Sequence, residues 1–97
     1  MLTWVIYDVS EDKRRNRIAK TCKEYGLYRI QKSVFLGDIP SQRADEIAEF
    51  SADLIDEKTD AVFILPCCRE DFEKRIVVGK KTFDETLVRD TRGAMVL

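Results

Sequence analysis

Residues 2–9, Leu-Thr-Trp-Val-Ile-Tyr-Asp-Val, decide the fold, because they form an apolar and aromatic stretch with one carboxylate, Asp8, close to its end. A stretch that is apolar on both faces is typical of a central strand of a sheet. Ser10 follows as a candidate helix N-cap, and a helix is predicted to run to about Tyr25, with Gly26 as its stop. The chain therefore begins with a strand and a helix.

Strands and helices alternate along the rest of the chain. The sequence predicts strands at 28–36, 61–65 and 75–78, a helix at 41–56 and a short helical or turn segment around 69–73. This order fits the split βαββαβ pattern if residues 28–38 form a long bent strand or a hairpin that counts twice, or if the acidic helix at 41–56 is displaced.

The expected fold class is α+β. We predict a ferredoxin-like, four-stranded antiparallel sheet with two helices on one face, plus a C-terminal strand or arm used in dimerisation. Residues 1–80 are expected to form this domain, and residues 81–97 a tail that contributes to dimer or partner contacts.

Composition limits the class of protein. The 97 residues are 44% hydrophobic, which fits one domain and excludes a disordered chain. We expect a cytoplasmic protein with no membrane partner, since no signal peptide is recognisable and no apolar run approaches the roughly 18–20 residues of a membrane helix. The lack of histidine excludes His-based triads. The adjacent Cys67 and Cys68 are expected to be small buried side chains rather than zinc ligands or part of a disulfide framework.

Charge is distributed unevenly along the chain, although the net charge is −1. Residues 13–32 carry eight basic side chains against Glu24 alone, whereas residues 33–73 are strongly acidic. The basic block is either a solvated helix face or a surface that follows phosphates.

Asp8 is the candidate for chemistry, since it ends an apolar row formed by Leu2, Trp4 and Ile6 on one side of the strand. A carboxylate at this edge either forms a local turn with the next helix or belongs to a site. Arg15 continues the inward stripe of the predicted helix and needs an anion, for which Asp8 and a bound phosphate are the candidates.

The available side chains favour a hard cation with oxygen ligands. One Asp, several Arg, Ser and Tyr, and no His are typical of a Mg²⁺ site. Two Asp8 residues related by a two-fold axis would supply the carboxylates. A metal-bound water would then attack a phosphodiester while Arg stabilises the developing charge.

Across the sheet, Arg29, Gln31 and Ser33 place polar groups on one strand face, which indicates a polar ligand or a second subunit.

Several motifs occur together in this chain: Tyr7-Asp-Val-Ser10, Asp12-Lys-Arg-Arg-Asn-Arg17, Tyr25-Gly26, Arg29-Ile-Gln-Lys-Ser-Val-Phe35 and Arg75-Ile-Val-Val-Gly79. In this combination the chain resembles the CRISPR-associated Cas2 family over roughly residues 3–79. The resemblance implies a ferredoxin-like homodimer that acts in spacer acquisition during antiviral defence, bound to a CRISPR-associated integrase. Some members of that family are metal-dependent endonucleases on single-stranded RNA or duplex DNA.

The resemblance also implies roles for individual residues. Asp8 matches the family's magnesium-binding aspartate. The matching positions for activity around it are Tyr7, Arg15, Arg17, Arg29, Ser33 and Phe35. The basic residues expected to contact nucleic acid are Lys13, Arg14, Arg15 and Arg17.

Two functions from different classes remain open. The first is a homodimeric, magnesium-dependent endonuclease. The second is a non-catalytic dimeric scaffold that grips duplex DNA and bridges integrase subunits. The basic block fits both, because salt-dependent binding to duplex DNA is expected in each case. An RNA-binding ferredoxin-like module ranks lower, because the strands lack the interleaved aromatic side chains on which bases stack.

Overall fold

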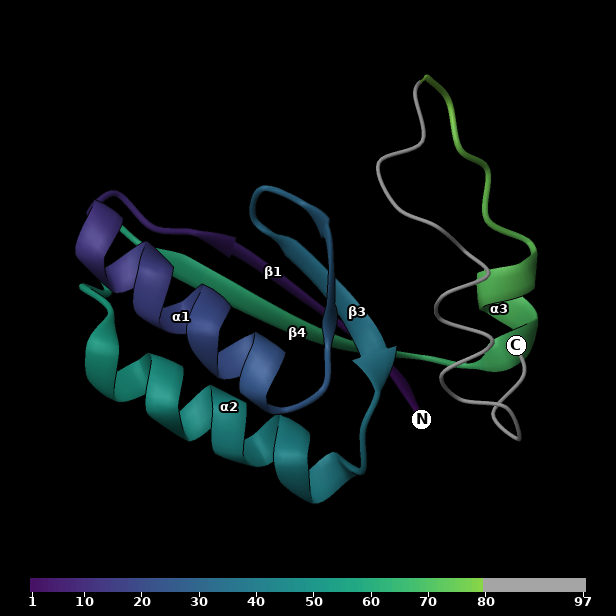
Figure 1. Ribbon diagram of the computed structural model, residues 1–97, viewed down its shortest axis with the longest axis horizontal. Helices are drawn as coiled ribbons and strands as arrows, with labels where there is room; N and C mark the ends of the chain where they lie inside the picture. Colours follow the sequence, from purple (N-terminus) through teal and green to yellow (C-terminus); the bar gives the residue numbers. More distant parts are fainter. Residues whose placement is uncertain (80–97) are drawn as a thin grey trace.

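The structure is a computed structural model, and it describes residues 1–79 of the chain. The elements are β1 (Leu2–Asp8), α1 (Asp12–Glu24), β2 (Tyr28–Gln31), β3 (Val34–Asp38), α2 (Ser41–Leu54), β4 (Ala61–Cys67) and α3 (Arg69–Glu73) (Figure 1). The predicted tail at 81–97 lies outside the described residues, so the domain boundary at residue 80 and the dimerisation arm stay predictions.

The sheet has the order β2-β3-β1-β4, and every neighbouring pair is antiparallel. Helices α1 and α2 lie side by side and cover one face of this sheet (Figure 1). With β1 and β3 in the centre, the chain follows the βαββαβ order of the ferredoxin-like fold. The predicted fold class is confirmed.

The strand predicted at 28–36 is a hairpin of two strands, β2 and β3. Arg29 lies opposite Phe35, and the pairing becomes irregular between Arg29 and Gln31. The chain turns at Lys32 and Ser33 between the two strands. Of the alternatives open from the sequence, the hairpin that counts twice is correct, and α2 keeps its place between β3 and β4.

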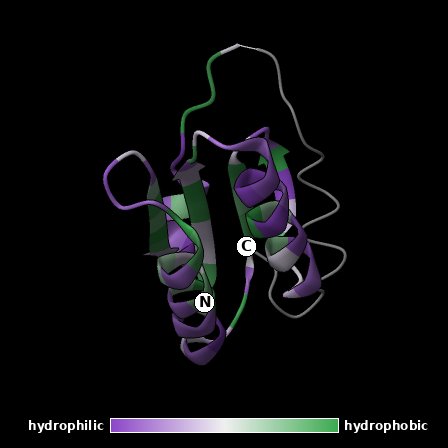
Figure 2. Cartoon of the chain, turned by 90° about the vertical axis from the view of Figure 1, so that its left-hand side faces the viewer, coloured by the Kyte–Doolittle hydropathy of each residue, from purple (hydrophilic) through white to green (hydrophobic). Residues whose placement is uncertain are grey.

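The strand predicted at 75–78 is wrong for the chain described here. Residues 75–79 adopt no strand and run away from the sheet as an extended segment (Figures 1 and 2). Ile76 and Val78 are 88% and 91% exposed. The apolar β-branched composition favours a strand, but a strand needs a neighbour to pair with, and no edge of this sheet lies beside the segment.

The two faces of the sheet differ in how they are covered. On the helix side, alternate residues of β1 pack with α1 and α2 in a core. This core contains Val5 and Tyr7 of β1, Val9 after it, Ile18 and Cys22 of α1, and Ile47 of α2. On the opposite face, α3 covers one end of the sheet through Phe72, whereas Phe63 and Leu65 of β4 stay 55% and 47% exposed. Figure 2 shows the strands coloured mainly as hydrophobic and the helices mainly as hydrophilic. We call the side of the sheet opposite the helices, with Ile6, Phe63 and Leu65, the open face.

The cysteines depart in part from expectation. Cys68 is exposed and caps α3, accepting a hydrogen bond from the amide of Asp71 at 3.4 Å, and Cys67 is half-buried. They are therefore not the buried side chains that the sequence predicted, because β4 ends between them at the rim of the sheet. Cys22 is fully buried, and this burial raises the pKa of its thiol to about 12.

Candidate active site

The end of β1 places Tyr7 and Asp8 on opposite faces of the sheet, because side chains alternate along a strand. Asp8 is exposed and lies opposite Ala61 at the start of β4, on the open face. Its carboxylate makes no hydrogen bond or ion pair with the residues that the structure describes. The turn-forming role that the sequence left open for Asp8 is therefore not observed, and the carboxylate is available to a ligand.

Tyr7 points into the core on the helix side and is only 4% exposed. Its hydroxyl donates a hydrogen bond to the carbonyl oxygen of Lys32 at 3.3 Å, and its ring lies 6.3 Å from that of Phe35. Burial raises the pKa of the Tyr7 phenol, although the Arg29 guanidinium offsets part of this rise. Tyr7 is therefore a neutral phenol at neutral pH, held against the hairpin.

The β2–β3 hairpin gathers four of the predicted site residues around its turn. Besides Tyr7 and the fully buried Phe35, these are Arg29 and Ser33. The Arg29 guanidinium lies 5.3 Å from the centre of the Phe35 ring and donates to the Lys32 carbonyl at 3.0 Å. The carbonyl of the half-buried Ser33 accepts a hydrogen bond from the Tyr7 amide at 3.1 Å. These contacts fasten the hairpin turn to the end of β1.

Arg15 lies at the turn between β1 and α1, but its partner is not Asp8. Its guanidinium forms an ion pair with Asp12 and donates to the carbonyl oxygens of Val9 at 2.8 Å and Ser10 at 3.2 Å. Of the two candidate anions, Asp8 is not the partner, since Asp12 lies one turn before Arg15 in α1 and the two side chains face each other. Arg15 is nevertheless fixed next to the segment that follows Asp8.

The other basic residues of α1 point in different directions. Arg17 lies over the Phe50 ring of α2, 5.6 Å from its centre, and so belongs to the outer side of the helix layer. Lys13 is exposed. Arg14 turns toward Asp60, with an N–O distance of 3.3 Å. The candidate nucleic-acid residues at 13–17 therefore surround α1, and Arg17 is not brought to Asp8.

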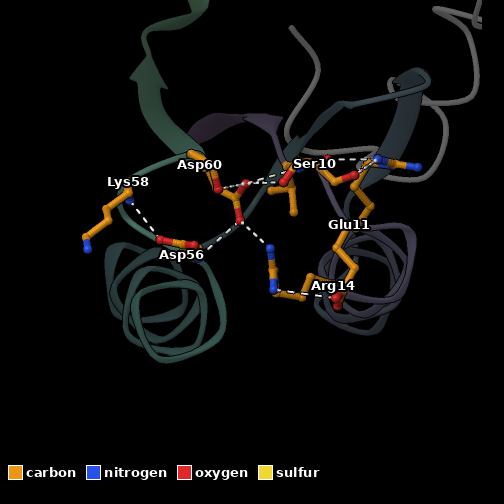
Figure 3. Close-up of polar contacts among 9 residues, drawn as sticks. Ser10, Glu11, Arg14, Asp56, Lys58 and Asp60 are labelled. Atoms are coloured by element: carbon orange, nitrogen blue, oxygen red, sulfur yellow. Dashed lines mark hydrogen bonds and ion pairs between the residues drawn. The ribbon is translucent and has the colours of Figure 1, made fainter.

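Sequence reasoning missed Asp60, which it treated as the start of a strand. The Asp60 side chain is completely buried between the ends of α1 and α2 (Figure 3). It accepts hydrogen bonds from the amide and hydroxyl of Ser10, the amide of Asp56 and the hydroxyl of Thr59. These bonds, above all the one from the Ser10 amide, hold the pKa of the carboxyl far below its usual range. An acidic residue directly before an apolar strand is the signal that would have pointed to it.

Ser10 is not the N-cap that the sequence predicted. The N-cap position of α1 is Glu11, which makes no capping hydrogen bond with its side chain. The Ser10 hydroxyl is instead directed to Asp60.

The potential for metal binding rests on Asp8. Within residues 1–79, no three Cys, Asp or Glu side chains gather closely enough to hold a metal ion together. Mg²⁺ usually keeps several waters and takes one or two carboxylates, so an exposed, unpaired Asp8 fits this kind of site, with further ligands from water, substrate or a second chain.

A protein-family model matches residues 1–75, and its description is "CRISPR associated protein Cas2". The chain belongs to the Cas2 family. It is 38% identical over 71 residues to a protein of Desulforudis audaxviator named CRISPR-associated endoribonuclease Cas2, covering 73% of this chain and 67% of that protein. The crystal structure of Streptococcus pyogenes Cas2 is similar with a TM-score of 0.69 and 30% identity, covering 81% of this chain and all of the other.

A further Cas2 relative joins two proteins in one chain. The Thermoproteus tenax protein named CRISPR-associated endonuclease Cas1/endonuclease Cas2 fusion is 39% identical over 49 residues, covering 50% of this chain and 19% of that protein. The resemblance stated from the motifs is thus confirmed for the Cas2 family. Among the described residues, no helix is long and apolar enough to cross a membrane.

Proposed function

We propose that this Cas2 chain acts in CRISPR spacer acquisition as a homodimeric, magnesium-dependent endonuclease that hydrolyses phosphodiester bonds of RNA or DNA. The observation that carries the proposal is the exposed Asp8 carboxylate, which has no partner among the described residues and follows an apolar strand on the open face. The names of the curated relatives, which call them endoribonucleases, support a nuclease.

The open face supports the homodimer. Phe63 and Leu65 are about half exposed beside the row that ends in Asp8, and contiguous exposed apolar surface marks an interaction site. A two-fold interface uses the same patch on both copies, so that pairing of the open faces would bury these side chains and place an Asp8 from each copy at one interface. Ile76 and Val78 add exposed apolar surface that a second copy would cover.

Each side chain has a role in this scheme. Asp8 would hold Mg²⁺, which when bound supplies an activated water and neutralises charge on the phosphate. Arg15, held at the turn that follows Asp8, would stabilise negative charge on the phosphate. Arg29, exposed at the hairpin, would bind a neighbouring phosphate. Tyr7, Ser33 and Phe35 would support these residues from the core, and Lys13, Arg14 and Arg17 would contact the nucleic-acid backbone away from the reacting bond.

The alternative is a non-catalytic dimer that grips duplex DNA and bridges integrase subunits. The observation that favours it is the Thermoproteus tenax relative, whose name joins Cas1 and Cas2 in one chain. The same basic helix would serve, and binding to the integrase is compatible with both functions.

We place the protein in the cytoplasm, because the three cysteines are unpaired thiols, as is usual in a reducing compartment.

An Asp8→Ala variant tests the nuclease proposal. The rate of cleavage of labelled single-stranded RNA and duplex DNA is measured with Mg²⁺ and after chelation, and duplex binding is measured on the same samples. We expect loss of Mg²⁺-dependent cleavage with binding retained, whereas the matched control Asp45→Ala, at an exposed acidic residue of α2, cleaves like the wild type. Cleavage by Asp8→Ala at the wild-type rate would show that Asp8 is not the catalytic carboxylate and would favour the scaffold.

A further inference from the structure

The buried carboxylate of Asp60 takes no part in the chemistry proposed above, yet it holds the turn that follows Asp8. Its Oδ1 accepts hydrogen bonds from the Ser10 amide at 3.0 Å and the Ser10 hydroxyl at 3.1 Å (Figure 3). Its Oδ2 accepts from the Asp56 amide at 3.1 Å and lies 3.3 Å from a guanidinium nitrogen of Arg14. One side chain thus connects the start of α1, the end of α2 and the start of β4.

This carboxylate holds the segment just before α1, because it binds Ser10, which precedes the N-cap residue Glu11. Glu11, at the N-cap position, makes no capping bond with its side chain, so the segment between β1 and α1 depends on Asp60. The same segment is fixed on its other side, since Ala61, the residue after Asp60, pairs with Asp8. The position of Asp8 is therefore coupled to that of Asp60 through one backbone pair and one turn.

We propose that Asp60 is a positioning residue, which fixes the turn from Asp8 to Ser10 and so determines where the Asp8 carboxylate is presented. This inference rests on the proposed function of Asp8. A carboxylate that must meet both a cation and a phosphate tolerates little displacement, because a misplacement of about 1 Å can lower a rate roughly 100-fold. The low pKa of Asp60 is consistent with this role, because it keeps the carboxyl ionised and accepting hydrogen bonds.

The test compares Asp60→Asn with a matched control, Asp53→Asn, in the full-length protein. Asp53 is an exposed residue of α2, and its substitution changes the charge equally. Cleavage is measured over a range of Mg²⁺ concentrations, well below the unfolding temperature of each variant. We expect Asp60→Asn to lower the rate about 10- to 100-fold and to raise the Mg²⁺ concentration for half-maximal rate, while Asp53→Asn changes neither. A merely structural residue would lower the unfolding temperature and leave the Mg²⁺ requirement unchanged.

A second variant keeps the test decisive if Asp60→Asn does not fold. Ser10→Ala removes one of the bonds that Asp60 accepts, so we expect a smaller shift of the Mg²⁺ requirement in the same direction. If Asp8→Ala is inactive but the folded Asp60 and Ser10 variants keep the wild-type Mg²⁺ requirement, the inference is wrong and the proposed function stands. If Asp8→Ala cleaves at the wild-type rate, the proposed function is wrong, and the inference is overturned with it.

Discussion

Replacing Tyr7 by phenylalanine separates a role in the fold from a role in the reaction. The substitution keeps the buried ring against Phe35 and removes only the hydroxyl, which donates to the Lys32 carbonyl at 3.3 Å. A hydrogen bond of this kind contributes about 0.5–1.5 kcal/mol net. We expect the lower half of that range, because the Lys32 carbonyl keeps a second donor, Arg29, at 3.0 Å. In a domain of fewer than 100 residues, ~1 kcal/mol corresponds to a change in Tm of about 4–8 °C.

The assay combines stability and activity. Thermal unfolding is followed by circular dichroism at pH 7, and Mg²⁺-dependent cleavage is measured well below both values of Tm. We expect Tyr7→Phe to lower Tm by about 2–8 °C and to keep the cleavage rate within about twofold, since the hydroxyl faces the helix layer and Asp8 faces the open side. The same substitution at the half-buried Tyr28, whose hydroxyl has no hydrogen-bond partner among residues 1–79, is the control and should leave Tm nearly unchanged.

The raised pKa of Tyr7 gives a second readout. Because burial keeps the phenol protonated at neutral pH, it cannot act as a general base there, and the pH profile of cleavage should be the same for wild type and Tyr7→Phe. A more than tenfold loss of cleavage with an unchanged Tm, or a shifted pH profile, would refute the reasoning and give the hydroxyl a part in the reaction.

Two further predictions concern charge. Arg17 lies over Phe50 on the outer helix layer, and we expect it to contact one phosphate of duplex DNA. Arg17→Ala should therefore reduce the slope of log binding constant against log salt concentration by about one. A slope equal to that of the wild type would remove Arg17 from the interface. Asp60 has a pKa lowered by folding, so its carboxylate stabilises the protein above the unfolded value of about 4. That contribution is lost as the pH falls toward the lower folded value. The Tm of wild type should therefore fall more steeply below about pH 4 than that of Asp60→Asn, and parallel curves would contradict this assignment.

Hydrophobic patterning was sufficient to predict β1, α1 and α2, because β1 is apolar on both faces and each helix buries one regular face. It was not sufficient for the hairpin. The alternation from Tyr28 to Phe35 continues through Lys32 and Ser33, of which only the serine is a residue that favours turns, and no non-glycine residue among those described has a positive φ. The prediction of a strand at 75–78 was wrong for another reason, since strand formation depends on a pairing partner that local composition does not reveal.

The candidate site likewise has features that local sequence predicts and features that depend on the three-dimensional fold. The placement of Asp8 on the same side as Leu2, Trp4 and Ile6 followed from a period of two, which is a local property of the strand, whereas the structure was needed to show that this side is the open face. The partner of Arg15 is Asp12, three residues earlier in the same helix, because the Asp8 side chain lies on the open face of the sheet. Asp60 lies fifty residues from Ser10 in the sequence, so its role in the turn could not be predicted before the topology was known.

Adjacent residues of one motif therefore have different structural roles. Tyr7 and Asp8 are consecutive, but the pleat of β1 sends one into the core and the other to the open face. Substitutions on the core side, at Tyr7 or Phe35, should change the free energy of unfolding first and activity only through the folded fraction. Substitution of Asp8, which is exposed and without a partner in the described chain, should leave stability nearly unchanged and remove Mg²⁺-dependent cleavage. A motif matched as a single string of letters thus contains one residue that packs in the core and one that is exposed on the open face.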